Sequence, residues 1–218
     1  MEPVERYIAS NDWITALLLL GLIALVFARS MFYSRFENFI ILPFNNKYVV
    51  LYNKKGRLLS GFHIAMCVFQ LLNLALFAYL AGLAFDGEMR WGTRFIFPVI
   101  LGGLLVFTLL KVGAQLLAGY LFESEQLAAS MVFSKLSYLN YSALILFAAN
   151  LLLTYLTPQS QVVAGIGLFL LITINAIGWI SVLKIHQKVI ASQFFYFILY
   201  LCALEISPFL IISGLLKA

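Results

Sequence analysis

Two ionisable side chains lie inside long apolar segments of this sequence, and they are the residues best suited to do chemistry. Glu205 lies in an apolar run that extends from Phe194 to Leu216, and Lys111 lies in the run from Phe95 to Leu121. A charged side chain at the centre of a bilayer costs about 2.5–3.5 kcal/mol on insertion scales, so each charge needs a compensating group. We therefore expect Glu205 and Lys111 to form an ion pair within the membrane.

Two further residues extend this predicted intramembrane polar network. Gln115 follows Lys111 by four positions and therefore lies on the same face of a helix. Pro208 follows Glu205 by three positions, removes a helical hydrogen bond and leaves the carbonyl of Leu204 without its helical donor. This arrangement is typical both of an ion or proton site and of a bent helix in a static bundle, and the residue pattern leaves both interpretations open.

The elements that would position these residues are transmembrane helices. The chain has 218 residues, of which 63% are hydrophobic and 11% are charged, with a mean hydropathy of +1.00. A soluble domain is roughly half apolar and about a quarter charged. Backbone groups in lipid must be bonded within their own segment, which favours helices, and the apolar runs do not alternate as the strands of a barrel would. The predicted fold is an all-α bundle of about six transmembrane helices, near residues 13–28, 62–85, 95–121, 138–156, 162–183 and 194–216.

The Lys and Arg residues predict the orientation of this bundle. Most of them lie in the connections after the first, third and fifth segments, and fewer lie at the termini and in the other connections. By the positive-inside rule the richer side is cytoplasmic, so both termini are expected outside. The net charge of +5 indicates attraction to a membrane surface. Nucleic acid is not an expected partner, because the basic residues are scattered between apolar segments.

Two cytoplasmic connections are longer than turns. Residues Met31–Ser60 interleave aromatic and basic side chains, a pattern that suits the headgroup layer. We expect a short interfacial helix from near Phe32 to Pro43, an extended segment over Asn46–Gly56 that ends in a turn, and a surface helix over Glu123–Ser137. These connections would either anchor the protein to the lipid bilayer or provide a docking surface for another membrane protein.

Uncharged polar residues and glycines are spread over the predicted spans. The polar residues can form hydrogen bonds between helices, and the glycines allow close helix approach. Packing explains both sets, and the alternative is a narrow polar path around Glu205. The polar residues are Gln70, Asn73, Asn150, Thr154, Thr173 and Asn175, and the glycines are Gly102, Gly103, Gly113, Gly165, Gly167 and Gly178.

Recognisable metal, cofactor and enzyme motifs are absent from the sequence. His63 and His186 are expected at the membrane interface, too shallow for a haem ligated by both histidines, and Cys67 and Cys202 lie in apolar runs without zinc-site spacing. The sequence contains no GxSxG, HExxH or P-loop motif and no pair of intramembrane aspartates. We therefore expect no catalytic residues, no metal and no cofactor.

Several short strings together resemble one family. They are Asn11-Asp-Trp13, Leu42-Pro-Phe-Asn-Asn-Lys-Tyr48, Lys111, Lys135-Leu-Ser-Tyr138 and Phe195-Tyr-Phe-Ile-Leu-Tyr-Leu-Cys-Ala-Leu-Glu-Ile-Ser-Pro208. This combination resembles the domain of unknown function 4271 family over nearly the whole chain. The resemblance implies an uncharacterised bacterial inner-membrane protein, mostly found in Bacteroidota, and it supplies no catalytic residues.

Two functional hypotheses follow. The first is a structural or accessory component of a larger membrane assembly, with Met31–Ser60 as its docking surface. The second is a small proton- or ion-coupled transporter in which Glu205 titrates and Lys111 is its counter-charge.

Overall fold

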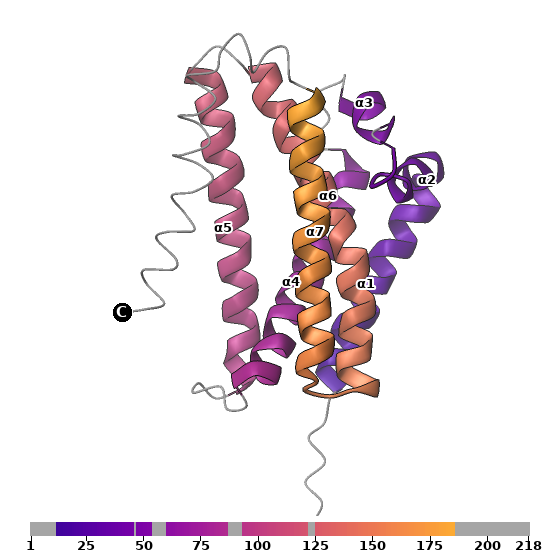
Figure 1. Ribbon diagram of the computed structural model, residues 1–218, viewed down its shortest axis with the longest axis vertical. Coiled ribbons are helices and arrows are strands. Elements are labelled where there is room, and N and C mark those ends of the chain that lie inside the picture. The colour runs from indigo at the N-terminus through magenta and orange to yellow at the C-terminus, as the bar shows by residue number, and fades with distance from the viewer. Residues whose placement is uncertain (1–11, 46, 54–59, 87–92, 122–124, 186–218) are drawn as a thin grey trace, which may run out of the picture.

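The computed structural model describes residues 12–45, 47–53, 60–86, 93–121 and 125–185 (Figure 1). Every element in these ranges is helical, which confirms the predicted all-α class. The elements in chain order are α1 (Asp12–Met31), α2 (Tyr33–Ile40), α3 (Lys47–Asn53), α4 (Gly61–Asp86), α5 (Thr93–Leu121), α6 (Glu125–Leu151), the π-helical turn η1 (Leu152–Leu156) and α7 (Gln161–Ile185). The predicted span at 194–216 lies outside the described residues.

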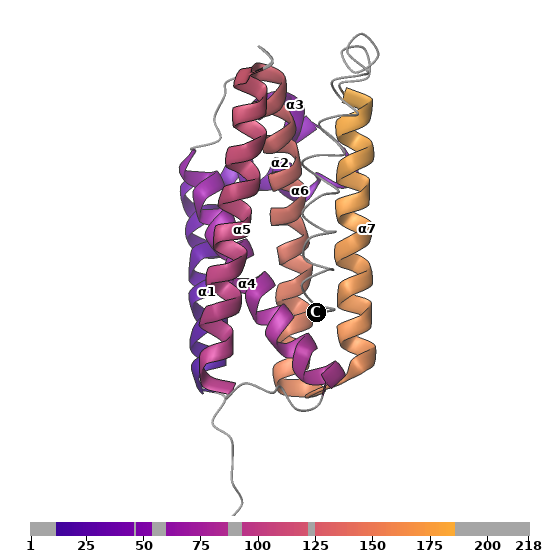
Figure 2. The same ribbon diagram turned by 90° about the vertical axis from the view of Figure 1, so that its left-hand side faces the viewer.

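Five of these helical segments are long and apolar enough to cross a membrane. They are α1, α4, α5, α6 together with η1, and α7. Helix α6 contacts α3, α4, α5 and α7, while α1 packs against α4. Figure 2 shows α1 and α7 on opposite sides of the bundle, with α4 and α6 between them. Helix α6 is therefore the element that joins the others.

Two glycines of α7 allow its close approach to α6 and α4. A Cβ atom at Gly178 would lie 2.6 Å from the ring of Tyr138, and one at Gly167 would lie 2.7 Å from the ring of Phe77 and 3.4 Å from Ala149. The pairs Gly178–Tyr138 and Gly167–Ala149 show that α6 and α7 run antiparallel. The prediction of close helix approach is therefore confirmed at Gly167 and Gly178.

For the four remaining glycines the described residues do not test this prediction. Within the described part of the chain, a Cβ atom at Gly102, Gly103, Gly113 or Gly165 would meet nothing within 4 Å. The first three lie on α5, which leaves large apolar side chains such as Val99, Leu109 and Leu117 exposed.

The predicted surface helix over Glu123–Ser137 is also wrong. Helix α6 begins at Glu125 and continues without a break through the segment predicted as the fourth span, and its residues from Met131 to Ser134 are buried. The serine hydroxyls explain how this polar stretch is buried: Ser134 donates to the carbonyl of Ser130 at 2.9 Å, and Ser137 donates to that of Phe133 at 2.7 Å. These hydrogen bonds stay within one helix, so the side chains need no water.

The connection between the first two predicted spans folds as two short helices rather than a helix and an extended segment. Helix α2 lies within the range predicted for the short helix, but residues 47–53 form α3, so the extended prediction is wrong there. The amide of Lys47 donates to Asn45 Oδ1 at 3.0 Å, which supports the first turn of α3. Tyr48 and Val49 are buried, so this short segment is stabilised by packing on the bundle.

Replacing the two close-packed glycines tests the α6–α7 interface. We expect Gly167→Ala and Gly178→Ala each to lower the free energy of unfolding by about 1–3 kcal/mol, because the added methyl group overlaps an aromatic ring. Gly165→Ala is the matched control on the same helix, with open space at its Cβ position. Thermal unfolding of the purified protein in one detergent measures the differences. An equal effect of all three substitutions would contradict the described packing.

Candidate functional site

A row of buried polar side chains lies between α4 and α6. Helix α4 supplies His63, Cys67, Gln70 and Asn73, and helix α6 supplies Asn140 and Asn150. The α4 residues follow one another at spacings of four, three and three, which places them on one face of the helix. All except the partly buried Cys67 are at most 3% exposed. We call this set the polar seam.

Direct hydrogen bonds join the two helices at two levels of the polar seam. Asn150 Nδ2 donates to the backbone carbonyl of Asn73 at 3.0 Å and lies 3.4 Å from its Oδ1. Asn140 Nδ2 lies 3.8 Å from Cys67 Sγ, a weak interaction with a soft acceptor. Cys67 comes before Asn73 along α4, and their partners Asn140 and Asn150 follow in the same order along α6. The two helices therefore run parallel.

Asn73 forms a hydrogen bond within its own helix and lies close to α1. Its Nδ2 donates to the carbonyl of Phe69 at 2.9 Å, and a Cβ atom at Gly21 of α1 would lie 3.3 Å from that nitrogen. The next turn beyond Asn150 is also polar, because the hydroxyl of Thr154 donates to the carbonyl of Asn150 at 2.7 Å. These bonds fix the amide groups of Asn73 and Asn150 in position.

Four members of the polar seam have a buried polar atom that lacks a partner among the described residues. These atoms are His63 Nε2, Gln70 Nε2, Asn140 Oδ1 and Asn150 Oδ1. An unsatisfied buried polar group costs about 1–3 kcal/mol. The polar seam therefore has unused hydrogen-bonding capacity along much of its length.

His63 is buried near the start of α4. Its ring stacks on Phe133, with the ring centroids 5.2 Å apart, and its predicted position at the membrane interface stays a prediction. Its backbone amide is 3.4 Å from the hydroxyl of Ser60, which caps the start of α4. Phe133 of α6, which stacks on His63, also stacks on Tyr48 of α3, and these packing contacts were not evident from hydropathy.

The predicted ion pair falls only partly within the described residues. Lys111 is half-buried and Gln115 is buried on α5, but Glu205 and Pro208 lie outside the described ranges. The pairing of Lys111 with Glu205 therefore stays a prediction. His186 and Cys202 also lie outside, and no three His, Cys, Asp or Glu side chains in the described ranges form a group that could hold a metal ion.

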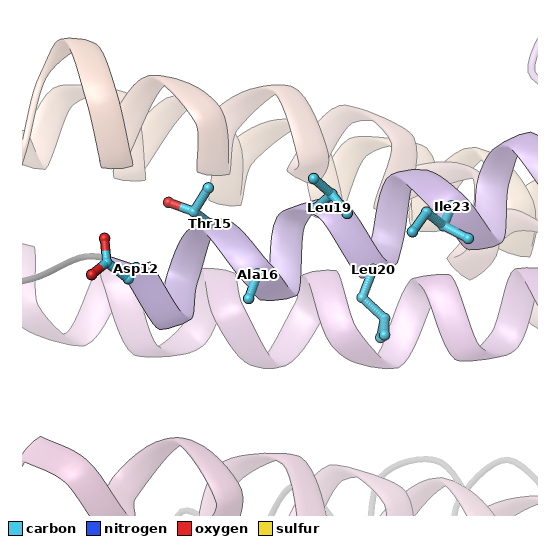
Figure 3. Close-up of a pocket in the computed structure, with 6 residues that line it drawn as sticks. All are labelled: Asp12, Thr15, Ala16, Leu19, Leu20 and Ile23. Atoms are coloured by element: carbon cyan, nitrogen blue, oxygen red, sulfur yellow. The ribbon is translucent and has the colours of Figure 1, made fainter.

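A shallow groove follows one side of α1, separate from the polar seam. It has a volume of about 430 Å³ and is lined by Asp12, Thr15, Ala16, Leu19, Leu20 and Ile23 (Figure 3). The lining is apolar apart from Asp12 and Thr15 at one end. A small-molecule site usually combines an enclosed shape with several converging polar groups, and this groove has neither.

A comparison with models of known protein families shows which family the chain belongs to. A family model described as domain of unknown function DUF4271 matches residues 14–216. The chain belongs to the DUF4271 family. This match agrees with the predicted resemblance and covers α4, α6 and the segment that contains Glu205. The search of curated proteins and the search of solved structures found no match.

Asn140 is the member of the polar seam that sequence reasoning missed. A signal was present, because Ser130, Ser134, Ser137 and Asn140 follow one another at spacings of four, three and three and so lie on one face of a helix. The division of this stretch into a surface helix and a span concealed the pattern, since it separated the serines from Asn140.

The bond between Asn150 and Asn73 gives a direct test of the polar seam. We expect Asn150→Leu to lower the free energy of unfolding by about 0.6–2 kcal/mol, because it removes a hydrogen bond between two helices. Asn175→Leu is the matched control, since Asn175 Nδ2 donates to the carbonyl of Leu171 within its own helix at 2.8 Å. Detergent-denaturation curves of both variants measure the difference. A loss for Asn175→Leu as large as that for Asn150→Leu would count against the seam.

Proposed function

We propose that this DUF4271 protein is a structural or accessory component of a larger assembly in the bacterial inner membrane, and that it is not an enzyme. In the orientation that we propose, α2 and α3 lie on the cytoplasmic side and both termini lie outside. The observation that supports a docking role is the packing of α2, α3 and residues 41–45 on the bundle. We call this part of the chain the cap.

The inner side of the cap is packed firmly on the bundle. Phe39 lies edge-on to Phe62, with ring centroids 5.7 Å apart, and Tyr48 stacks on Phe133 at 5.8 Å. The Tyr138 hydroxyl lies 3.5 Å from the carbonyl of Leu42, a long contact between α6 and the cap. Burial raises the pKa of Tyr48 well above its ordinary value of 10.0, so its phenol stays neutral. The cap is therefore a fixed surface.

The outer side of the cap exposes large apolar side chains. Phe44 is 89% exposed, and Tyr33, Ile40 and Ile41 are also exposed. The guanidinium of Arg35 lies 5.0 Å from the ring centroid of Tyr52 and 5.9 Å from that of Phe32, which holds a positive charge beside these aromatic rings. Lipid headgroups would bind such a surface, but a rigid cap with an exposed apolar edge also suits a partner protein.

A photo-crosslinking amino acid at position 44 tests the docking role. In native membranes we expect it to crosslink to one specific protein, because Phe44 lies at the exposed edge of the cap. The same amino acid at Phe169 is the control, since that side chain is 67% exposed on the spanning helix α7 and is expected to face lipid. Crosslinks to lipid alone at both positions would refute the proposed partner.

The alternative function is proton- or ion-coupled transport by Glu205 and Lys111. It is favoured by the burial of Gln115 one turn from Lys111, because a buried amide beside a cation inside a span is a polar site that lipid cannot satisfy.

Reconstituted vesicles distinguish this alternative from an accessory role. A transporter should carry flux that Glu205→Gln abolishes, because glutamine cannot release a proton. A Glu125→Gln variant is the control, since Glu125 lies at the exposed start of α6. Flux that is absent, or that persists in Glu205→Gln, would exclude transport by this residue.

A further inference from the structure

Four atoms of the polar seam have no hydrogen-bond partner among the described residues, and a ligand that bonds to all four must both donate and accept hydrogen bonds. Gln70 Nε2 is a donor, Asn140 Oδ1 and Asn150 Oδ1 are acceptors, and neutral His63 Nε2 serves as either. Exchanging the oxygen and nitrogen of an amide would alter these roles but would still leave one end of the group unpaired. An anion or a cation would match only part of this set, whereas water matches all of it.

The ligand must also be small. The polar seam is closed by direct contacts between α4 and α6 at Asn73–Asn150 and at Cys67–Asn140, and the unpartnered residue Gln70 lies between Cys67 and Asn73 along α4. His63 is enclosed by its stacking on Phe133. A ligand larger than a few atoms would have to separate helices that already touch.

We propose that the polar seam between α4 and α6 is a binding site for a short row of internal water molecules, bonded to His63, Gln70, Asn140 and Asn150. A buried water typically makes about three hydrogen bonds to such groups. Bonding to water removes the cost of leaving these groups unsatisfied in a low-dielectric interior. The site goes beyond the proposed accessory function and depends on neither the partner protein nor Glu205.

The proposed row of water molecules is long in comparison with the hydrocarbon core of a bilayer. His63 and Asn73 are ten residues apart on α4, which corresponds to about 15 Å at the helical rise of about 1.5 Å per residue. The hydrocarbon core is about 30 Å thick. The row, which starts at the end of the bundle that carries the cap, is therefore about half as long as that thickness.

Solid-state NMR of the full chain in lipid bilayers tests the site. Magnetisation is transferred from water protons to the side-chain amide of Asn150, whose signal is assigned by its loss in Asn150→Leu. We expect this transfer to be several-fold faster than transfer to the backbone amide of Ala75. Ala75 is the control because it lies on the same helix as Asn73, is fully buried and belongs to an apolar cluster.

A second variant shows whether the named groups hold the water. Replacing Gln70 by Met and Asn140 by Leu together removes two of the four unpartnered groups, and we expect transfer to Asn150 to slow towards that of Ala75. Equal transfer rates for Asn150 and Ala75 in the unmodified protein would overturn the proposal. Contacts from Asn150 to a residue of segment 186–218 in place of water would overturn it as well, as would fast transfer that the double variant leaves unchanged.

Discussion

Polar side chains in a bilayer must form their hydrogen bonds inside the protein, and the packing of this bundle depends on how α6 meets that requirement. Ser134 and Ser137 bond to carbonyls of their own helix, so they add polarity without requiring a partner elsewhere. Asn150 instead bonds to Asn73 and connects α6 to α4. This combination lets α6 pack closely on its neighbours while it carries many polar residues.

Apolar contacts complete the arrangement around α6. Gly167 and Gly178 bring α7 against the rings of Phe77 and Tyr138, where van der Waals contact is the main attraction available between helices in lipid. The hydrocarbon-like outer surfaces of α1 and α5 add little to this association, because lipid and leucine are equally apolar. The small and polar residues therefore determine which helices become neighbours.

The cap and the polar seam meet at one end of the bundle. Phe133 contacts Tyr48 of the cap and His63 of the seam, so one α6 side chain belongs to both. The cap therefore covers the end of the polar seam where α4 begins. A partner protein bound at Phe44 would therefore lie at the end of the bundle where Phe133 stacks on His63.

Composition and hydropathy were sufficient to predict an all-helical protein with several long apolar segments, because bilayer thickness and backbone bonding leave few other solutions. The resemblance to the DUF4271 family was also readable from short strings, and the family match confirms it. The polar residues of the predicted spans were expected to bond between helices, and the structure confirms this for Asn73 and Asn150. Thr154, Thr173 and Asn175 instead donate to carbonyls of their own helices.

The tertiary structure decided the features that depend on which face of each helix meets another. In the structure His63 is buried and residues 47–53 form a helix. The predicted surface helix and the segment predicted as the fourth span form one continuous helix. Sequence pattern could not decide these points, because lipid-facing and protein-facing surfaces of a membrane helix are both apolar. The amino-acid sequence therefore determined that the chain forms long apolar helices, and close packing between them determined where its polar groups gather.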